Sequence, residues 1–255
     1  MKKLIKYVMI DILRNKVILG YTLFLLAVSF SVFNLEDNTS KGLLSLLNIV
    51  LIIVPLLSSI FSTIYVYNSS EFIELLVSQP VKRTTLISSI SAGLTSSLMF
   101  AVLVGIGLPV LLYDRSDVGF IVVLAATLLT FVFVALAMLS SVITRDKAKG
   151  IGVSLLLWFY FAVIFDGLIL FILFQFADYP LEKLSIGLTA FNPIDLCRIL
   201  VLLRMDISVM MGYTGAVFKE FFEGITGYLF IGTVLIAWVC IPIILAVRKF
   251  MKKDL

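Results

Sequence analysis

The amino-acid sequence predicts an all-α integral membrane protein with six transmembrane helices in a single domain, residues 1–255. Hydrophobic residues make up 61% of the chain, against roughly 45–50% in soluble domains. Charged residues make up only 14%, against about 25% in soluble proteins. A soluble core of this size cannot hide that much apolar surface. The composition therefore excludes a water-soluble enzyme, a nucleic-acid-binding protein and a disordered regulator.

The residue types present also exclude most catalytic chemistry. The sequence contains no histidine, and its two cysteines, Cys197 and Cys240, lie far apart. These facts rule out histidine-dependent nucleophiles, zinc motifs and a disulfide framework. The nucleotide-binding pattern GxxxxGK followed by Ser or Thr occurs nowhere in the chain. We therefore expect no catalytic residue, no metal ligand and no cofactor in this chain.

Six apolar stretches are long enough to cross the hydrocarbon core of a bilayer, which takes about 20 residues of helix. Charged residues collect between these stretches, where water can solvate them. The exception is Asp166, which lies within the fifth stretch. The expected spans are about 17–33, 43–67, 86–112, 118–143, 150–176 and 227–247.

The first stretch follows a basic segment that has a helical pattern of its own. Ile5, Val8, Met9 and Ile12 fall on one side of a helix, with lysines around them. This pattern is typical of a helix lying in the membrane interface, although a merely basic flank fits nearly as well. No convincing A-x-A cleavage site follows residues 17–33, so we expect a retained span rather than a signal peptide.

Lysine and arginine are distributed unevenly between the two sides of the predicted spans. The side that holds both termini carries fourteen of the 20 Lys and Arg residues. Because basic residues concentrate on the cytoplasmic side, we expect both termini to be cytoplasmic. The net charge of +4 is therefore interpreted as a sign of topology rather than of nucleic-acid binding.

The connection after the second span, residues 68–83, predicts a short amphipathic helix on the cytoplasmic side. Asn68 and Glu71 have the spacing of a capping box, and Pro80 would end the helix. Glu71, Glu74 and Ser78 lie on the polar face, and Phe72, Leu75 and Leu76 lie on the apolar face. The apolar face either rests on lipid or docks into a cytoplasmic partner, and both interpretations stay open.

Asp166 needs a partner or water, because a carboxylate near the middle of a bilayer costs roughly 2.5–3.5 kcal/mol. We expect it to face the protein interior or an aqueous cavity. It is either a proton or substrate site, or an acid that hydrogen-bonds neighbouring helices. The predicted spans contain no second charge that would relay a proton, so we favour the structural role.

The long segment between the fifth and sixth spans, about residues 177–226, is expected on the outer side. Asn192-Pro193 is a strong helix start. Asp195 and Arg198 then fall three residues apart, which allows an ion pair on one helix face. The apolar run that follows is too short to span, so this helix lies in the outer interface or dips back in. The segment is either a platform for an outer partner or a cap over the helix bundle.

Three methionines occur in the same segment, Met205, Met210 and Met211. Thioether sulfur suits Cu(I), which would permit a metal role. Methionines among large apolar residues more often fill irregular gaps in a core, so we expect these three to pack rather than to bind metal.

The chain resembles a known family over essentially its whole length. The six spans, the basic N-terminal helix and EFIELLVSQPVKR at 71–83 resemble the permeases of type-two ABC transporters. LLLWFYFAVIFDGLIL at 155–170 and FNPIDLCRIL at 191–200, followed by MGYTGA at 211–216, are similar to the membrane subunits of nitrous-oxide-reductase maturation transporters. The more discriminating feature is an Asp in the fifth span together with a downstream NPxDxxR motif.

In that family the cytoplasmic segment after the second span acts as the coupling helix to the ATPase. The resemblance assigns this role to Glu71, Phe72, Glu74, Leu75, Leu76, Gln79 and Pro80. It also implies a homodimer in the bacterial inner membrane that carries two copies of a separate cytoplasmic ABC ATPase. ATP and magnesium would be bound by that partner.

On the outer side the resemblance implies a periplasmic copper-handling β-helix protein seated on the long segment. The residues implied for this contact are Asn192, Pro193, Asp195, Arg198, Met211, Gly212 and Tyr213. ATP hydrolysis would then drive a conformational change that reaches the partner during assembly of the copper centres of nitrous oxide reductase. The substrate (copper, a sulfur species or none) and the direction of transport stay open.

Two alternatives stay open beside this interpretation. One is a general ABC exporter permease for a lipid, peptide or drug, and the other is a membrane scaffold that moves no substrate. A self-sufficient secondary transporter would instead show inverted repeats and broken helices. Pro55, Pro109 and Pro242 could break helices, but residues 1–115 and 116–255 show no repeat.

Overall fold

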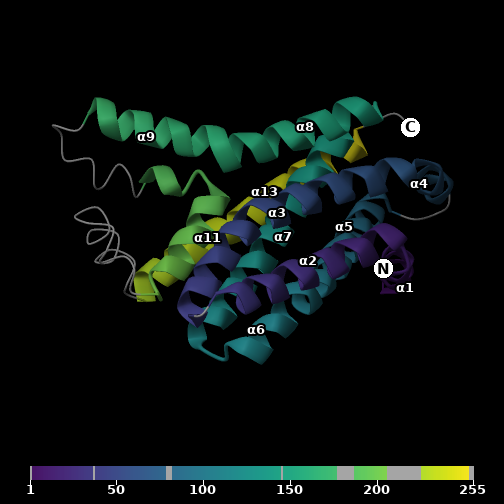
Figure 1. Ribbon diagram of the computed structural model, residues 1–255. Coiled ribbons are helices and arrows are strands. Elements are labelled where there is room, and N and C mark those ends of the chain that lie inside the picture. The colour runs from purple at the N-terminus through teal and green to yellow at the C-terminus, as the bar shows by residue number, and fades with distance from the viewer. Residues whose placement is uncertain are drawn as a thin grey trace.

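The computed structural model describes residues 2–36, 38–78, 82–144, 146–176, 187–205 and 225–252. Every regular element within these ranges is helical, and six helices are long and apolar enough to cross a membrane (Figure 1). The predicted all-α class with six spans is confirmed, and a multi-pass membrane protein is supported.

The six spans begin and end a few residues beyond most of the apolar stretches, because polar residues complete their first and last turns. Asn38, for example, accepts a hydrogen bond from the Ser40 N–H at 2.9 Å and so begins the second span before its apolar run. The spans are formed by α2 (Lys16–Leu35), α3 (Thr39–Asn68), α5 (Arg83–Val102) with η1 (Leu103–Gly107) and α6 (Leu108–Tyr113), α7 (Asp117–Ile143), α8 (Lys147–Phe159) with η2 (Tyr160–Ile164) and α9 (Phe165–Gln175), and α13 (Ile225–Met251).

Helix α7 forms the centre of the bundle. It packs against α3, α5 and α13, and against the shorter helix α11 (Pro193–Leu202). Ala125 and Ala126 are fully buried on α7, and such small side chains allow neighbouring helices to approach closely. Figure 1 shows both termini at one end of the bundle, as expected for an even number of spans.

Helix α1 (Lys2–Leu13) precedes the first span and packs along α5. Val8 and Ile12 are buried, whereas Tyr7 is exposed. A Cβ atom added to Gly93 of α5 would lie 2.5 Å from the Val8 Cγ1, so glycine allows the two helices to approach. The predicted amphipathic helix is therefore present, and its apolar face packs against protein.

The third and fifth spans each contain a π-helical turn, η1 and η2. Pro109 follows η1 and has no N–H to donate to a preceding carbonyl. By contrast, α3 and α13 continue through Pro55 and Pro242. A π-helical turn changes the pairing of backbone carbonyls and often occurs at a functional site.

Candidate functional site

Helix α11 lies among the spans. Asn192 precedes it, and the Asn192 Oδ1 accepts a hydrogen bond from the Ile194 N–H at 3.0 Å, while Pro193 occupies the first turn. Its apolar side chains are buried where α11 packs against α7, α3 and α13. These side chains are Ile194, Leu196, Cys197, Leu200 and Val201. Helix α11 therefore packs into the helix bundle, and its depth relative to the membrane stays a prediction.

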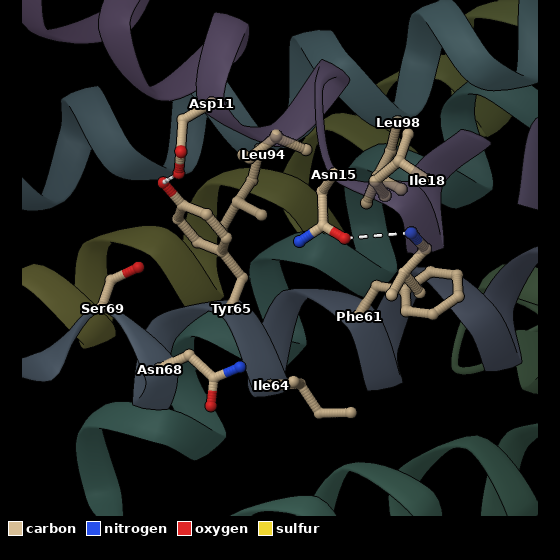
Figure 2. A pocket seen from close by; sticks show the side chains of 12 residues that line it. Asp11, Asn15, Ile18, Phe61, Ile64, Tyr65, Asn68, Ser69, Leu94 and Leu98 are labelled. Carbon is tan, nitrogen blue, oxygen red and sulfur yellow. Dashed lines mark hydrogen bonds between the residues drawn. The ribbon is translucent and has the colours of Figure 1, made fainter. Parts of the chain in front are cut away.

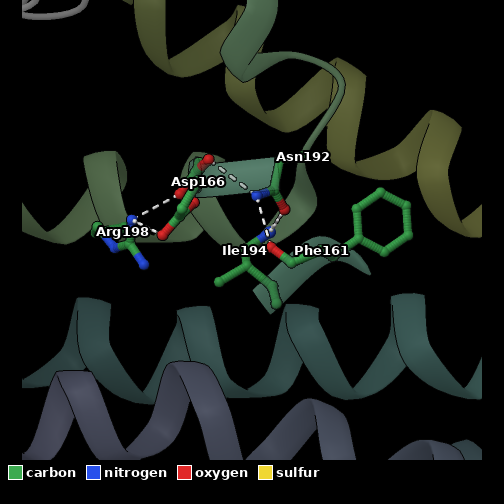
Figure 3. A network of polar contacts seen from close by, with 6 residues as sticks. Phe161, Asp166, Asn192, Ile194 and Arg198 are labelled. Atoms are coloured by element: carbon green, nitrogen blue, oxygen red, sulfur yellow. Dashed lines mark hydrogen bonds and ion pairs between the residues drawn. The ribbon is translucent and has the colours of Figure 1, made fainter. Parts of the chain in front are cut away.

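Arg198 joins two carboxylates that come from different elements (Figure 3). Its Nη1 donates to Asp195 Oδ1 at 2.7 Å and to Asp166 Oδ2 at 3.1 Å. The ion pair between Asp195 and Arg198 agrees with their spacing in the sequence. The contact with Asp166 does not follow from the sequence. We expected no second charge beside Asp166, and α11 brings one from 32 residues further along the chain.

Asn192 connects the same residues to the backbone of the fifth span. Its Nδ2 donates to the Phe161 carbonyl and to Asp195 Oδ2, both at 2.9 Å. Phe161 lies in η2, so the π-helical turn presents this carbonyl to α11 (Figure 3). Asn192 is fully buried, and these contacts replace the hydrogen bonds that water would otherwise make. We call the Phe161 carbonyl and the side chains of Asp166, Asn192, Asp195 and Arg198 the polar cluster.

The electrostatics of the polar cluster centre on Asp195. Burial raises the pKa of Asp195 to about 7, while the Arg198 cation opposes this shift and the Asp166 carboxyl adds to it. The Asp195 side chain is 8% exposed, against 31% for Asp166 and 35% for Arg198. Asp195 is therefore the group of the cluster that can bind or release a proton near neutral pH.

Helix α8, the first half of the fifth span, is held against the bundle by hydrogen bonds between hydroxyl groups. The Ser154 Oγ lies 2.6 Å from the Thr63 Oγ1 and 2.7 Å from the Ser140 Oγ, which joins α8 to α3 and α7. One turn earlier, a Cβ atom added to Gly150 would overlap the Tyr67 hydroxyl. Sequence reasoning missed this contact. The available indication was a glycine and a serine four residues apart on one face of an apolar span.

Helix α4 (Ser70–Val77) connects the second and third spans (Figure 1). Ile73 is buried, Leu76 packs half-buried against the hydrophobic core, and Phe72 stacks on Tyr7 of α1 with ring centroids 5.5 Å apart. Leu75 is 65% exposed. The predicted apolar face is therefore divided, because Phe72 and Leu76 hold α4 on the bundle and Leu75 faces outward.

The start of α4 differs from the sequence prediction. Asn68 is the last residue of α3, and Ser69 is the residue that precedes α4. The Asn68 Oδ1 accepts a hydrogen bond from the Lys147 Nζ at 2.8 Å. The predicted capping box of Asn68 with Glu71 is therefore wrong, because α3 continues through Asn68. Glu71 and Glu74 are exposed, as is Leu75.

The remaining predicted residues lie in the outer segment or outside the described residues. Met205 is half-buried and packs against the hydrophobic core, as expected for a methionine that fills a gap. Of the described residues implied for the outer partner, Asn192, Pro193 and Asp195 are buried, and Arg198 is partly exposed. Gln79, Pro80, Met210, Met211, Gly212 and Tyr213 lie outside the described residues.

No model of a known protein family matches the chain, and no curated protein matches it. The polar cluster and α4 are the two features of the described residues that bear on function. Figure 1 shows α4 at the end of the bundle that holds the termini, with α9 and α11 towards the other end.

Proposed function

We propose that this chain is the membrane-spanning permease subunit of an ABC transporter, driven by a separate cytoplasmic ATPase. The observation that carries the proposal is α4, an amphipathic helix of eight residues that the bundle holds from one side. Its other side presents Glu71, Glu74 and Leu75, a combination that suits a groove in a partner protein. Because one residue separates α3 from α4, a force on α4 acts directly on a span.

The distribution of charge supports a cytoplasmic position for α4. Exposed basic residues gather at the same end of the bundle, and under the positive-inside rule this end faces the cytoplasm together with both termini. They include Arg14, Lys16, Lys147, Arg248 and Lys249. ATP and magnesium are bound by the partner in this proposal, since the sequence has no phosphate-binding loop.

The fifth span offers a mechanical route from α4 to the outer side. Lys147 at its start contacts Asn68 beside α4, and Ser154 in its first half contacts Thr63 of α3. Asp166 in its second half contacts Arg198 of α11. Movement of α4 and α3 on ATP binding therefore shifts the fifth span and with it the polar cluster.

The outer end receives a periplasmic copper-handling β-helix protein in this proposal, during copper-centre maturation of nitrous oxide reductase. The support is the resemblance of residues 155–170 and 191–200 to the membrane subunits of such transporters. These two segments are the ones that meet in the polar cluster. Arg198, with its partly exposed guanidinium, is the residue of the cluster that we assign to the partner contact.

A second copy of the chain fits against the fifth span. This span is the least buried of the six candidates, and its α9 half presents large apolar side chains outward. They are Leu168, Leu170, Phe171 and Phe174. A homodimer built through this face would carry two ATPases and would cover apolar surface that lipid otherwise covers.

The proposal is tested by Leu75→Asp. The full-length tagged chain is purified from its native membranes with the ATPase that accompanies it and is reconstituted in liposomes. Because Leu75 is exposed, the variant should insert and fold normally. In the docked complex, however, its carboxylate would be buried without a partner, at a cost of several kcal/mol. We expect ATPase binding to fall at least about tenfold.

The matched control is Leu35→Asp, which changes an exposed leucine at the opposite end of the bundle and should leave ATPase binding unchanged. Two results would contradict the proposal. One is that no ATPase accompanies the purified chain. The other is that Leu75→Asp binds the ATPase as well as the wild type, which would favour the scaffold alternative.

A further inference from the structure

A cavity of about 300 Å³ lies among α1, α2, α3 and α5, at the end of the bundle that holds both termini (Figure 2). Its lining has a polar side and an apolar side. Asp11, Asn68, Ser69 and the Tyr65 hydroxyl form the polar side, and Ile18, Phe61 and Leu98 form the apolar side. The cavity is separate from the polar cluster, and no residue of α4 lines it.

The two sides of the cavity lie at different depths along the spans. Because α2 begins at Lys16 and α3 ends at Asn68, the polar side stands at the level where these spans begin and end. Phe61 lies seven residues before Asn68 on α3, which is about 10 Å deeper at the rise of an α-helix. The cavity therefore extends from the interface towards the hydrocarbon core and suits a ligand with a polar head and an apolar chain.

The polar side carries an anion at its edge, the carboxylate of Asp11. The Asp11 Oδ2 accepts a hydrogen bond from the Tyr65 hydroxyl at 3.1 Å, and the exposed carboxylate has room to accept more. A headgroup with a primary amine can donate charge-assisted hydrogen bonds to this carboxylate. A choline headgroup has no N–H to donate, and a glycerol headgroup carries no positive charge.

We propose that this cavity binds phosphatidylethanolamine. The amine donates to Asp11, and the start of an acyl chain lies against Ile18, Phe61 and Leu98. A lipid in this position touches all four helices around the cavity. It therefore fastens α1 to the spans from the membrane side.

The test uses the purified full-length protein, equilibrated in detergent with equal amounts of phosphatidylethanolamine, phosphatidylglycerol and phosphatidylcholine. Native mass spectrometry counts the lipids retained. We expect the wild type to retain phosphatidylethanolamine about fivefold over either competitor, the ratio that one partly exposed ion pair supports. Asp11→Asn keeps an acceptor for Tyr65 but loses the charge, and should lose this preference. Asp117→Asn, an exposed acid at the opposite end, should keep it.

A second variant changes the shape of the cavity and not its charge. Ile64→Phe narrows the space beside Phe61 and should lower the retention of phosphatidylethanolamine. Equal retention of the three lipids by the wild type would overturn the proposal, as would a preference for phosphatidylglycerol. An undiminished preference for phosphatidylethanolamine in Asp11→Asn would overturn it too.

Discussion

Replacing Asn192 by Asp should loosen the contact between the fifth span and α11 while keeping the start of α11 intact. Asp caps a helix about as well as Asn, so the bond from the Ile194 N–H can be kept. A carboxylate donates no hydrogen bond, so the contacts to the Phe161 carbonyl and to Asp195 are lost. The variant thus separates the capping role of Asn192 from its role in joining two helices.

The size of the effect follows from the contacts of the buried side chain. The bond to the Phe161 carbonyl joins two helices, and such bonds in membrane proteins contribute about 0.6 kcal/mol. The bond to Asp195 lies within the start of α11 and contributes about 0.5 kcal/mol, so the two together account for about 1 kcal/mol. The acceptors left without a donor, together with a third carboxyl beside Asp195 and Asp166, add roughly 1–3 kcal/mol. The expected loss at pH 8 is about 2–4 kcal/mol, or a fall in unfolding midpoint of about 5–10 °C.

The measurement is the thermal unfolding of the purified full-length chain in detergent at pH 8 and pH 5.5. Asn34→Asp serves as the control, because exposed Asn34 also donates to a backbone carbonyl but water can replace that bond. Part of the loss in Asn192→Asp should be recovered at pH 5.5, because Asp195, whose pKa burial raises to about 7, binds a proton there and repels the new carboxyl less. A midpoint for Asn192→Asp within about 1 °C of the wild type at pH 8 would refute the reasoning.

Two further predictions concern the same span and its partner helix. Gly150→Ala should destabilise the protein by about 1–3 kcal/mol, because its Cβ overlaps the Tyr67 hydroxyl. Gly152→Ala, which faces open space, should be neutral or stabilising, and equal unfolding midpoints for the two variants would contradict this. The raised pKa of Asp195 means that the folded state keeps a proton that the unfolded state releases. Stability should therefore fall as pH rises from about 4 to about 7 and change little from this group above that range. Asp195→Asn should remove this contribution, so parallel curves of unfolding midpoint against pH for variant and wild type would count against it.

The six spans can be predicted from the sequence because each helix that crosses a bilayer must by itself be long and apolar enough to do so. A segment must supply about 20 apolar residues whatever its neighbours are, so composition along the chain is sufficient. The amphipathic α1 is predictable for a similar reason. Val8 and Ile12 lie one turn apart, and this spacing marks the buried face before the surface that covers it is known.

The position of α4 was predictable, but its start and its outward face were not. The end of α3 at Asn68 coincides with a contact to Lys147 of α8, 79 residues away. The burial of Phe72 depends on Tyr7 of α1, which lies against it. Periodicity distinguishes an apolar face from a polar one, and it does not say which apolar side chain a neighbouring helix will cover.

The polar cluster was decided by tertiary structure. The sequence determined the pair of Asp195 and Arg198, because residues three apart on a helix are neighbours in any fold. It did not determine the contact of Arg198 with Asp166 or that of Asn192 with the Phe161 carbonyl. Those contacts depend on the depth at which α11 packs against α7 and on the π-helical turn beside it. Local patterns record the faces of one helix, whereas the rotation and depth of two helices relative to each other are set by the packing of the whole bundle.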